Sequence, residues 1–289
     1  LRHIARRFPD VRLPILTGVS AGAINTAYLA NRRAGIPEAV EELADLWRGI
    51  RTDHVFESGS FSLAAMALRW GLRLVSGGSG LRPRTRGLVD TRPLRDFLTR
   101  HLRADGARRL QGIEANLARG ALRAVAITST NYATGQSVTW VQGRGVRMWQ
   151  RPHRISRPAE LTVKHVMASS SLPIFFPAIH VGDEWHGDGG IRLTAPLSPA
   201  LHLGADRVLA ISTRYRRSSR DADERSTEGY PPPAQVLGVL MNAIFLDMFD
   251  FDADNLSRVN ELIRHLPEEQ RMGLRVVELL VLRPSVDLG

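Results

Sequence analysis

A serine between two glycines is the first feature whose residue types could do chemistry. The segment "LTGVSAG" places Gly18, Ser20 and Gly22 between an apolar, strand-like run and a helix-like run. A reactive serine of the GxSxG type needs this order, because it occupies a sharp strand-to-helix turn in which larger flanking side chains would collide. The N–H groups at the start of the helix would then face the reacting oxygen. The pattern favours Ser20 as a nucleophile, and the alternative is a tight turn that contains a serine.

A serine hydroxyl reacts only when another group accepts its proton, so Ser20 would need a base. Asp188 is followed by Gly189 and Gly190, and an aspartate held by a glycine turn could approach a serine hydroxyl closely. Asp-Gly is also among the commonest turn dipeptides, which leaves a purely structural turn as the alternative. If Asp188 is the base, the two residues form a serine–aspartate dyad that needs no histidine.

Three histidines offer a different arrangement, a three-residue triad. His202 and His265 follow Ser20 in the chain order of an α/β-hydrolase, and His186 would share a strand face with Asp188. The α/β-hydrolase fold, however, needs an oxyanion strand and loop before its serine, and only 19 residues precede Ser20. We therefore favour the dyad. The other histidines lack metal-ligand spacing, so we predict no metal site.

The positive charge of the chain does not by itself predict a nucleic-acid partner. The formal net charge is +10, but Lys164 is the only lysine, so 38 of the 39 basic residues are arginine. These arginines are scattered and accompany no nucleic-acid motif, so we predict no nucleic-acid binding. The positive charge is at least as consistent with attraction to anionic lipid headgroups as with binding of nucleic acid. The absence of cysteine excludes disulfides and a thiol nucleophile.

Alternating strand and helix patterns would position the candidate residues. Strands are predicted at 12–17, 121–130, 136–143, 206–213 and 274–282, a hairpin turn at 131–135, helices at 21–31, 36–47 and 90–102, and a loop at 76–87. This alternation predicts an α/β layered fold with a largely parallel sheet. Two further helices, at 61–75 and 234–249, are strongly apolar. We interpret them as buried, with a membrane-facing or interfacial position as the alternative.

Three separated segments resemble those of the patatin-like phospholipase family. They are "GVSAG" at 18–22, "ASSSLPIFFP" at 168–177, and "DGG" at 188–190 followed by "PLSPALHLGADRVLAIS". They occur in the order found in that family, and the resemblance extends to about Thr213, with a looser stretch from Arg51 to Leu102. It implies a three-layer α/β sandwich and hydrolysis of carboxylic esters in phospholipids or other lipids.

The same resemblance assigns roles to individual residues. Ser20 would form an acyl-enzyme, and water activated by Asp188 would release the acyl group without a metal or organic cofactor. The segment 168–177 would form a turn beside this site. Its serines, Ser169, Ser170 and Ser171, are expected to satisfy backbone groups at a helix end instead of acting as rival nucleophiles.

One element of the family pattern lies outside the sequence. The family carries a first strand and a glycine-rich oxyanion loop upstream of the elbow, whereas this chain begins at Leu1 in a helix-like segment. We interpret this as a cut into a longer polypeptide, with the oxyanion hole expected upstream of Leu1. Because loss of one oxyanion donor costs about a hundredfold to a thousandfold in rate, we expect impaired activity from the fragment. The alternative function is a non-catalytic, patatin-like protein that binds lipid or serves as a scaffold.

Domain organisation and location follow from the same patterns. We expect a patatin-like catalytic domain at 1–213, a polar, arginine-rich linker or surface loop at 214–233, and C-terminal helices with one strand at 234–289 packed on the same domain. No apolar run reaches the roughly 18 residues of a membrane span. A cytoplasmic or peripheral membrane protein is expected, and a signal peptide in a preceding part of the polypeptide stays open.

Overall fold

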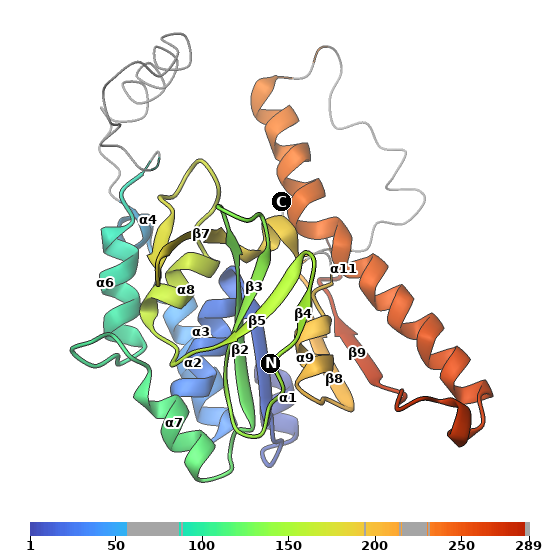
Figure 1. Cartoon of the computed structure of the whole chain (residues 1–289). Coiled ribbons are helices and arrows are strands. Elements are labelled where there is room, and N and C mark those ends of the chain that lie inside the picture. Colours follow the sequence, from blue (N-terminus) through green and yellow to red (C-terminus); the bar gives the residue numbers. More distant parts are fainter. Residues whose placement is uncertain are drawn as a thin grey trace. The chain divides into compact units, whose positions relative to one another are not determined.

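The computed structural model describes residues 1–56, 87, 89–193, 195–213, 215, 230 and 232–286, without the side chains of 233, 234, 237 and 240–248. These residues belong to two compact units, Leu1–Gly190 and Ile191–Gly289 (Figure 1), which we describe separately. The helix predicted at 61–75 and most of the loops predicted at 76–87 and 214–233 lie outside the described residues. The domain boundary predicted at residue 213 stays a prediction.

A seven-stranded sheet forms the centre of the first unit. Its strands are β1 (Ile15–Val19), β2 (Ala124–Asn131), β3 (Ser137–Gly143), β4 (Gln150–Arg151), β5 (Arg154–Pro158), β6 (Ile179–Val181) and β7 (Glu184–Asp188). They are ordered β4-β5-β3-β2-β7-β6, and β1 also pairs with β2 (Figure 1). The predicted strand at 12–17 is thus shifted toward the elbow, because β1 begins to pair with β2 only at Ile15.

The sheet is mixed, and the parallel pairing expected from the sequence describes part of it. Within the described residues, β1–β2 and β3–β5 are parallel, and the other pairs of neighbouring strands are antiparallel. The physical reason is that short turns join β2 to β3 and β6 to β7, and a chain that reverses in a short turn can only pair antiparallel. The predicted hairpin turn after Asn131 supplies the first of these reversals.

The register of β2 explains how distant segments meet. Since β3 occupies one edge of β2, both β1 and β7 pair with the other edge. The parallel β1 ends with Val19 opposite Thr128, and the antiparallel β7 ends with Asp188 opposite Ser129. The carboxyl ends of β1 and β7 therefore point toward each other at adjacent residues of β2.

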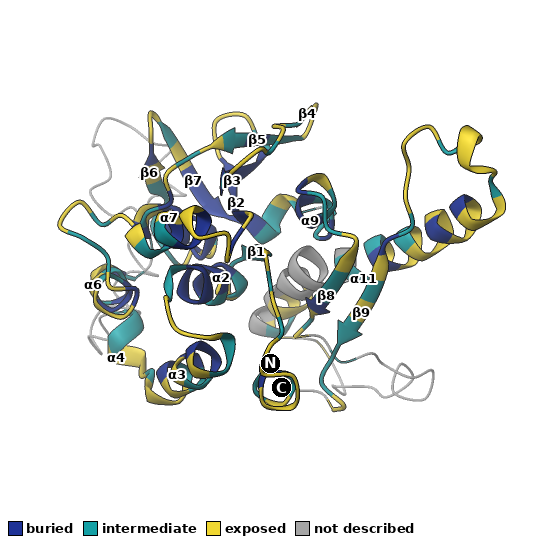
Figure 2. Ribbon diagram, turned by 90° about the horizontal axis from the view of Figure 1, so that it is seen from below, coloured by how far each residue is buried: buried dark blue, intermediate teal, exposed yellow. Residues whose placement is uncertain are grey.

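Helices cover one face of this sheet. They are α1 (Arg2–Arg7), α2 (Ala21–Asn31), α3 (Ile36–Gly49), α4 (Thr52–Val55), α6 (Arg92–His101), α7 (Gln111–Ala118) and α8 (Val163–Ser169). Their apolar side chains form one core with Val125 and Ile127 of β2 and Val138 and Trp140 of β3, which alternate along their strands and so share a face. Every residue of β2 is buried (Figure 2). The strand that positions the candidate residues is thus also the best-packed one.

The second unit contains a small parallel sheet and one long helix. Its elements are α9 (Ser198–His202), β8 (Arg207–Ile211), α11 (Pro233–His265), the 3₁₀ helix η2 (Glu268–Gln270) and β9 (Glu278–Leu282), preceded by η1 (Gly189–Arg192) at the junction of the units. β8 and β9 pair in parallel, and Ala210 packs with Leu197 and Ala253. The helix predicted at 234–249 continues without a break to His265. Among the helices that the structure describes, none has the length and hydropathy that crossing a bilayer requires.

Candidate active site

Ser20 occupies the turn between the end of β1 and the start of α2. Its backbone has φ 54° and ψ −128°, a conformation that non-glycine residues rarely adopt. Gly18 permits this turn, because a Cβ there would lie 2.2 Å from the carbonyl oxygen of Gly22 and 2.5 Å from Oγ1 of Thr26. A Cβ at Gly22 would meet no atom within 4 Å. The steric reason expected for both elbow glycines therefore holds for Gly18 and is wrong for Gly22.

Asp188 lies at the end of β7 and faces Ser20. Ser20 Oγ donates a hydrogen bond of 2.7 Å to Asp188 Oδ2, and the N–H of Gly190 donates one of 2.8 Å to Oδ1. The carboxyl is fully buried, and this burial raises its pKa to about 6, against the opposing effect of the two hydrogen bonds. Gly189 keeps the turn close to the sheet, because a Cβ there would lie 2.1 Å from the carbonyl oxygen of Thr128.

Three consecutive serines at the end of α8 form hydrogen bonds with Ser20 and Asp188. The N–H of Ser20 donates to Ser169 Oγ at 3.0 Å, and Ser170 Oγ donates to the carbonyl oxygen of Ser20 at 3.0 Å. The N–H of Asp188 donates to the carbonyl oxygen of Ser171 at 2.8 Å. The three hydroxyls satisfy backbone groups, as expected. Sequence reasoning missed that two of them bind the backbone of Ser20 itself.

Each of the three histidines considered for a triad has a hydrogen bond to a residue other than Ser20. His186, two residues before Asp188 in β7, is fully buried, and its Nδ1 lies 3.1 Å from Ser129 Oγ. Burial lowers the pKa of His186, partly opposed by the charge of Glu184. His202 and His265 belong to the second unit, and each hydrogen-bonds a backbone carbonyl one turn earlier in its own helix. The hydrogen-bond partner of the Ser20 hydroxyl is a carboxylate.

Tyr132 is a neighbour of the site that sequence reasoning treated only as part of a turn. Its side chain is about half exposed, and a Cβ on Gly187 would lie 2.0 Å from the Tyr132 hydroxyl. Burial and the negative charge of Asp188 both raise the pKa of Tyr132. The Tyr132 phenol therefore lies over Gly187, close enough to Asp188 for the carboxylate charge to act on it.

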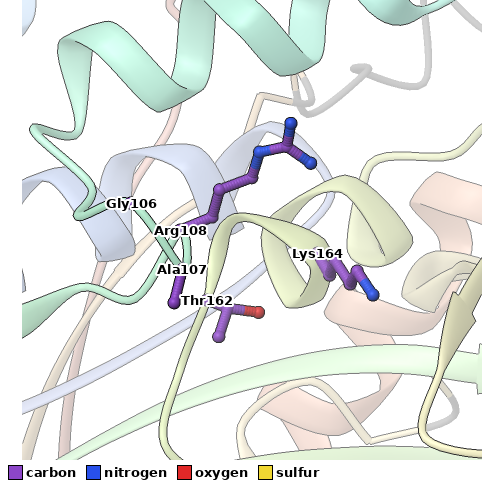
Figure 3. A pocket seen from close by; sticks show the side chains of 5 residues that line it. All are labelled: Gly106, Ala107, Arg108, Thr162 and Lys164. Atoms are coloured by element: carbon purple, nitrogen blue, oxygen red, sulfur yellow. The ribbon is translucent and has the colours of Figure 1, made fainter.

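Two hollows in the first unit lie apart from this pair. One, of about 240 Å³, is lined by Gly106, Ala107, Arg108, Thr162 and Lys164 (Figure 3). It adjoins the start of α8, whereas the serines that contact Ser20 are at the end of that helix. The other, of about 460 Å³, is lined by residues of α2, α3, α4 and α6. Within the described part of the chain, no group of three histidine or carboxylate side chains could hold a metal ion.

Comparison with known proteins matches residues 6–201 to the model of the patatin-like phospholipase family. The matched range contains the elbow, the serines of α8 and Asp188 with its glycines, and it covers more than half of the chain. It confirms the resemblance drawn from the three segments and the α/β fold class that the resemblance implies. No curated protein matches the chain. The oxyanion loop expected upstream of Leu1 stays a prediction.

Proposed function

The chain belongs to the patatin-like phospholipase family, and from this premise we propose that it hydrolyses carboxylic esters of lipids through a Ser20–Asp188 dyad. Family membership supports the general activity, a lipid acyl hydrolase. The hydrogen bond of 2.7 Å between Ser20 Oγ and Asp188 Oδ2 is the observation that carries the mechanism. It gives the hydroxyl proton a direct path to a carboxylate oxygen.

Acylation follows from this geometry. Ser20 Oγ attacks the ester carbonyl carbon while its proton passes to Asp188 Oδ2. The tetrahedral intermediate collapses, the bond to the alcohol oxygen breaks, and Asp188 returns the proton to the departing alcohol. Ser20 is left esterified by the acyl chain. The acyl-enzyme divides one difficult step into two easier ones.

Deacylation uses the same carboxylate. A water molecule gives a proton to Asp188 and attacks the acyl carbonyl carbon. Collapse of the second intermediate breaks the bond to Ser20 Oγ, which recovers the proton from Asp188, and releases the fatty acid. A pKa of about 6 suits this role, because Asp188 is mostly ionised at neutral pH and yet accepts a proton more readily than an exposed aspartate.

A fluorophosphonate probe tests the dyad, because it reacts only with an activated serine. We expect the complete protein to be labelled at Ser20, Ser20→Ala to abolish labelling, and Asp188→Asn to slow it by several orders of magnitude while the fold is retained. His186 and the two histidines of the second unit should be dispensable for labelling. A label on a different serine, or near-normal labelling of Asp188→Asn, would refute the dyad. No labelling together with retained lipid binding would support the non-catalytic alternative.

A further inference from the structure

The backbone of Ser20 is held by hydroxyl groups of another helix. Ser169 and Ser170, at the end of α8, are separated from Ser20 by about 150 residues of sequence and yet bind its N–H and its carbonyl oxygen. We propose that Ser169 and Ser170 are positioning residues that keep Ser20 Oγ within hydrogen-bonding distance of Asp188. This inference rests on the proposed function and names two further residues on which the same reaction depends.

The elbow needs such support because its conformation is unfavourable. A serine with φ 54° and ψ −128° lies outside the regions that residues other than glycine normally occupy. A strained residue persists only when its surroundings determine its geometry. The N–H and C=O groups of Ser20 are fixed from the α8 side, and both bonds measure 3.0 Å. These groups belong to the two peptide units on either side of the Ser20 Cα, so rotation of either unit toward a relaxed conformation would break one of the bonds.

The direction of the hydrogen bonds at Ser169 makes this support specific. Ser169 Oγ donates its own proton to the carbonyl oxygen of Thr128 at 2.6 Å. Its oxygen therefore faces the N–H of Ser20 as an acceptor. Thr128 is the residue of β2 opposite Val19, the last residue of β1. Ser169 thus ties the nucleophile to the central strand at the point where β1 ends.

The same segment also holds the base. The carbonyl oxygen of the next serine, Ser171, accepts a hydrogen bond of 2.8 Å from the N–H of Asp188. Three consecutive residues of one chain segment therefore bind the N–H of Ser20, its carbonyl oxygen and the N–H of Asp188. Relative motion of Ser20 and Asp188 would require breaking bonds to this common segment.

Ser156 provides a matched control. Its hydroxyl is buried like those of Ser169 and Ser170 and also binds the main chain, because Ser156 Oγ accepts from the N–H of Trp149 at 2.7 Å and donates to the carbonyl oxygen of Trp149 at 3.2 Å. Ser156 lies in β5, which β3 separates from β2. Ser156→Ala therefore removes a buried hydroxyl and leaves the bonds to the dyad in place. Ser169→Ala and Ser170→Ala each remove one bond to the backbone of Ser20.

The experiment compares the three alanine variants with the unaltered protein. It measures fluorophosphonate labelling of Ser20, kcat and KM on a short-chain soluble ester, and urea unfolding. We expect Ser169→Ala and Ser170→Ala to lower kcat and the labelling rate by about 10-fold to 100-fold, as loss of orienting contacts typically does. KM should stay within about twofold, because the hydroxyls do not bind substrate. Ser156→Ala should label and turn over at the normal rate.

Cysteine variants separate hydrogen bonding from packing. A thiol fills nearly the same space as the hydroxyl but is a weak donor and acceptor. Ser169→Cys and Ser170→Cys should therefore remain well packed and still label slowly. If Ser169→Ala does not fold, Ser170→Ala and the two cysteine variants give the result.

Two outcomes overturn the inference in different ways. If the unaltered protein labels at Ser20 and the variants of Ser169 and Ser170 label as fast as Ser156→Ala, the positioning role is wrong and the proposed function stands. If the unaltered protein does not label at Ser20, the proposed function fails and the inference fails with it. A rate loss that merely follows the loss of stability, equally in all three alanine variants, also refutes the positioning role.

Discussion

Replacement of Asp188 by asparagine should make the protein more stable at neutral pH while removing its activity. The carboxyl is fully buried, and burial raises its pKa from 3.8 to about 6 in the folded state. The ionised form is therefore disfavoured by folding. Asparagine carries no charge and can keep both contacts, with its carbonyl oxygen accepting from Gly190 and its amide donating to Ser20 Oγ.

The magnitude follows from the pKa change. A rise from 3.8 to about 6 corresponds to roughly 3 kcal/mol of unfolding free energy. Because the folded-state pKa is raised, the stability that protonated Asp188 contributes is fully present below about pH 4 and is lost as the pH rises through about 6. Asp188→Asn does not lose unfolding free energy in this way, because the asparagine side chain does not ionise. Its advantage over the unaltered protein should therefore grow by roughly 2.5 kcal/mol between pH 4 and pH 8.

Urea unfolding at a series of pH values measures this difference. Subtracting the curves of the two proteins removes the contribution of every other titrating group, provided that the urea dependence is the same in both. Asp183→Asn is the matched control, since Asp183 is exposed in the turn before β7. The control reports how the removal of one exposed carboxylate changes the unfolding free energy. A difference between Asp188→Asn and the unaltered protein that is the same at pH 4 and pH 8 would refute the buried, destabilising carboxylate.

Three further outcomes are expected. The value of kcat/KM on a soluble ester should rise with pH through about 6 and be roughly tenfold lower at pH 5 than at pH 8, since only ionised Asp188 accepts a proton; a flat profile would contradict this. In urea unfolding, Gly18→Ala should lower the unfolding free energy by more than about 2 kcal/mol, because its Cβ would overlap the backbone of α2. Gly22→Ala should change the unfolding free energy by less than about 1 kcal/mol in the same measurement. His202→Ala and His265→Ala should leave turnover within about twofold of normal in an ester assay, and a large loss in either would reopen the triad.

Local patterns in the sequence predicted the elements of the site. Glycine at position 18, the apolar run before it and the helix-like run after it placed Ser20 at a strand-to-helix turn, where the structure has it. The glycine turn after Asp188 left two interpretations open, and Gly189 lies against the backbone of β2, as the interpretation of close approach requires. The elbow at Gly18 depends on short-range sterics, because the clash that its glycine avoids is with Gly22, only four residues away.

The arrangement between distant segments could not be read in this way. No local pattern shows that β1 and β7 share one edge of β2 and end at adjacent residues, Thr128 and Ser129. For the same reason, the serines of α8 were expected to bind backbone groups near a helix end, and their bonds to Ser20 were missed. The hairpin turn at 131–135 was predicted from the sequence. The mixed sheet also depends on which strands pair across longer distances, and no local pattern shows that.

The burial of Asp188 explains how the proposed chemistry can do without histidine. A histidine serves as a base near neutral pH because its ordinary pKa is about 6.5, whereas that of an exposed aspartate is about 3.9. Removal from water raises the pKa of the Asp188 carboxyl to about 6. Its affinity for a proton is then nearly that of imidazole. The cost is a charge that folding disfavours, offset elsewhere by the well-packed strand on which Ser20 and Asp188 converge. A two-residue site thus depends on the dry environment at the junction of β1 and β7 as much as on the residues themselves.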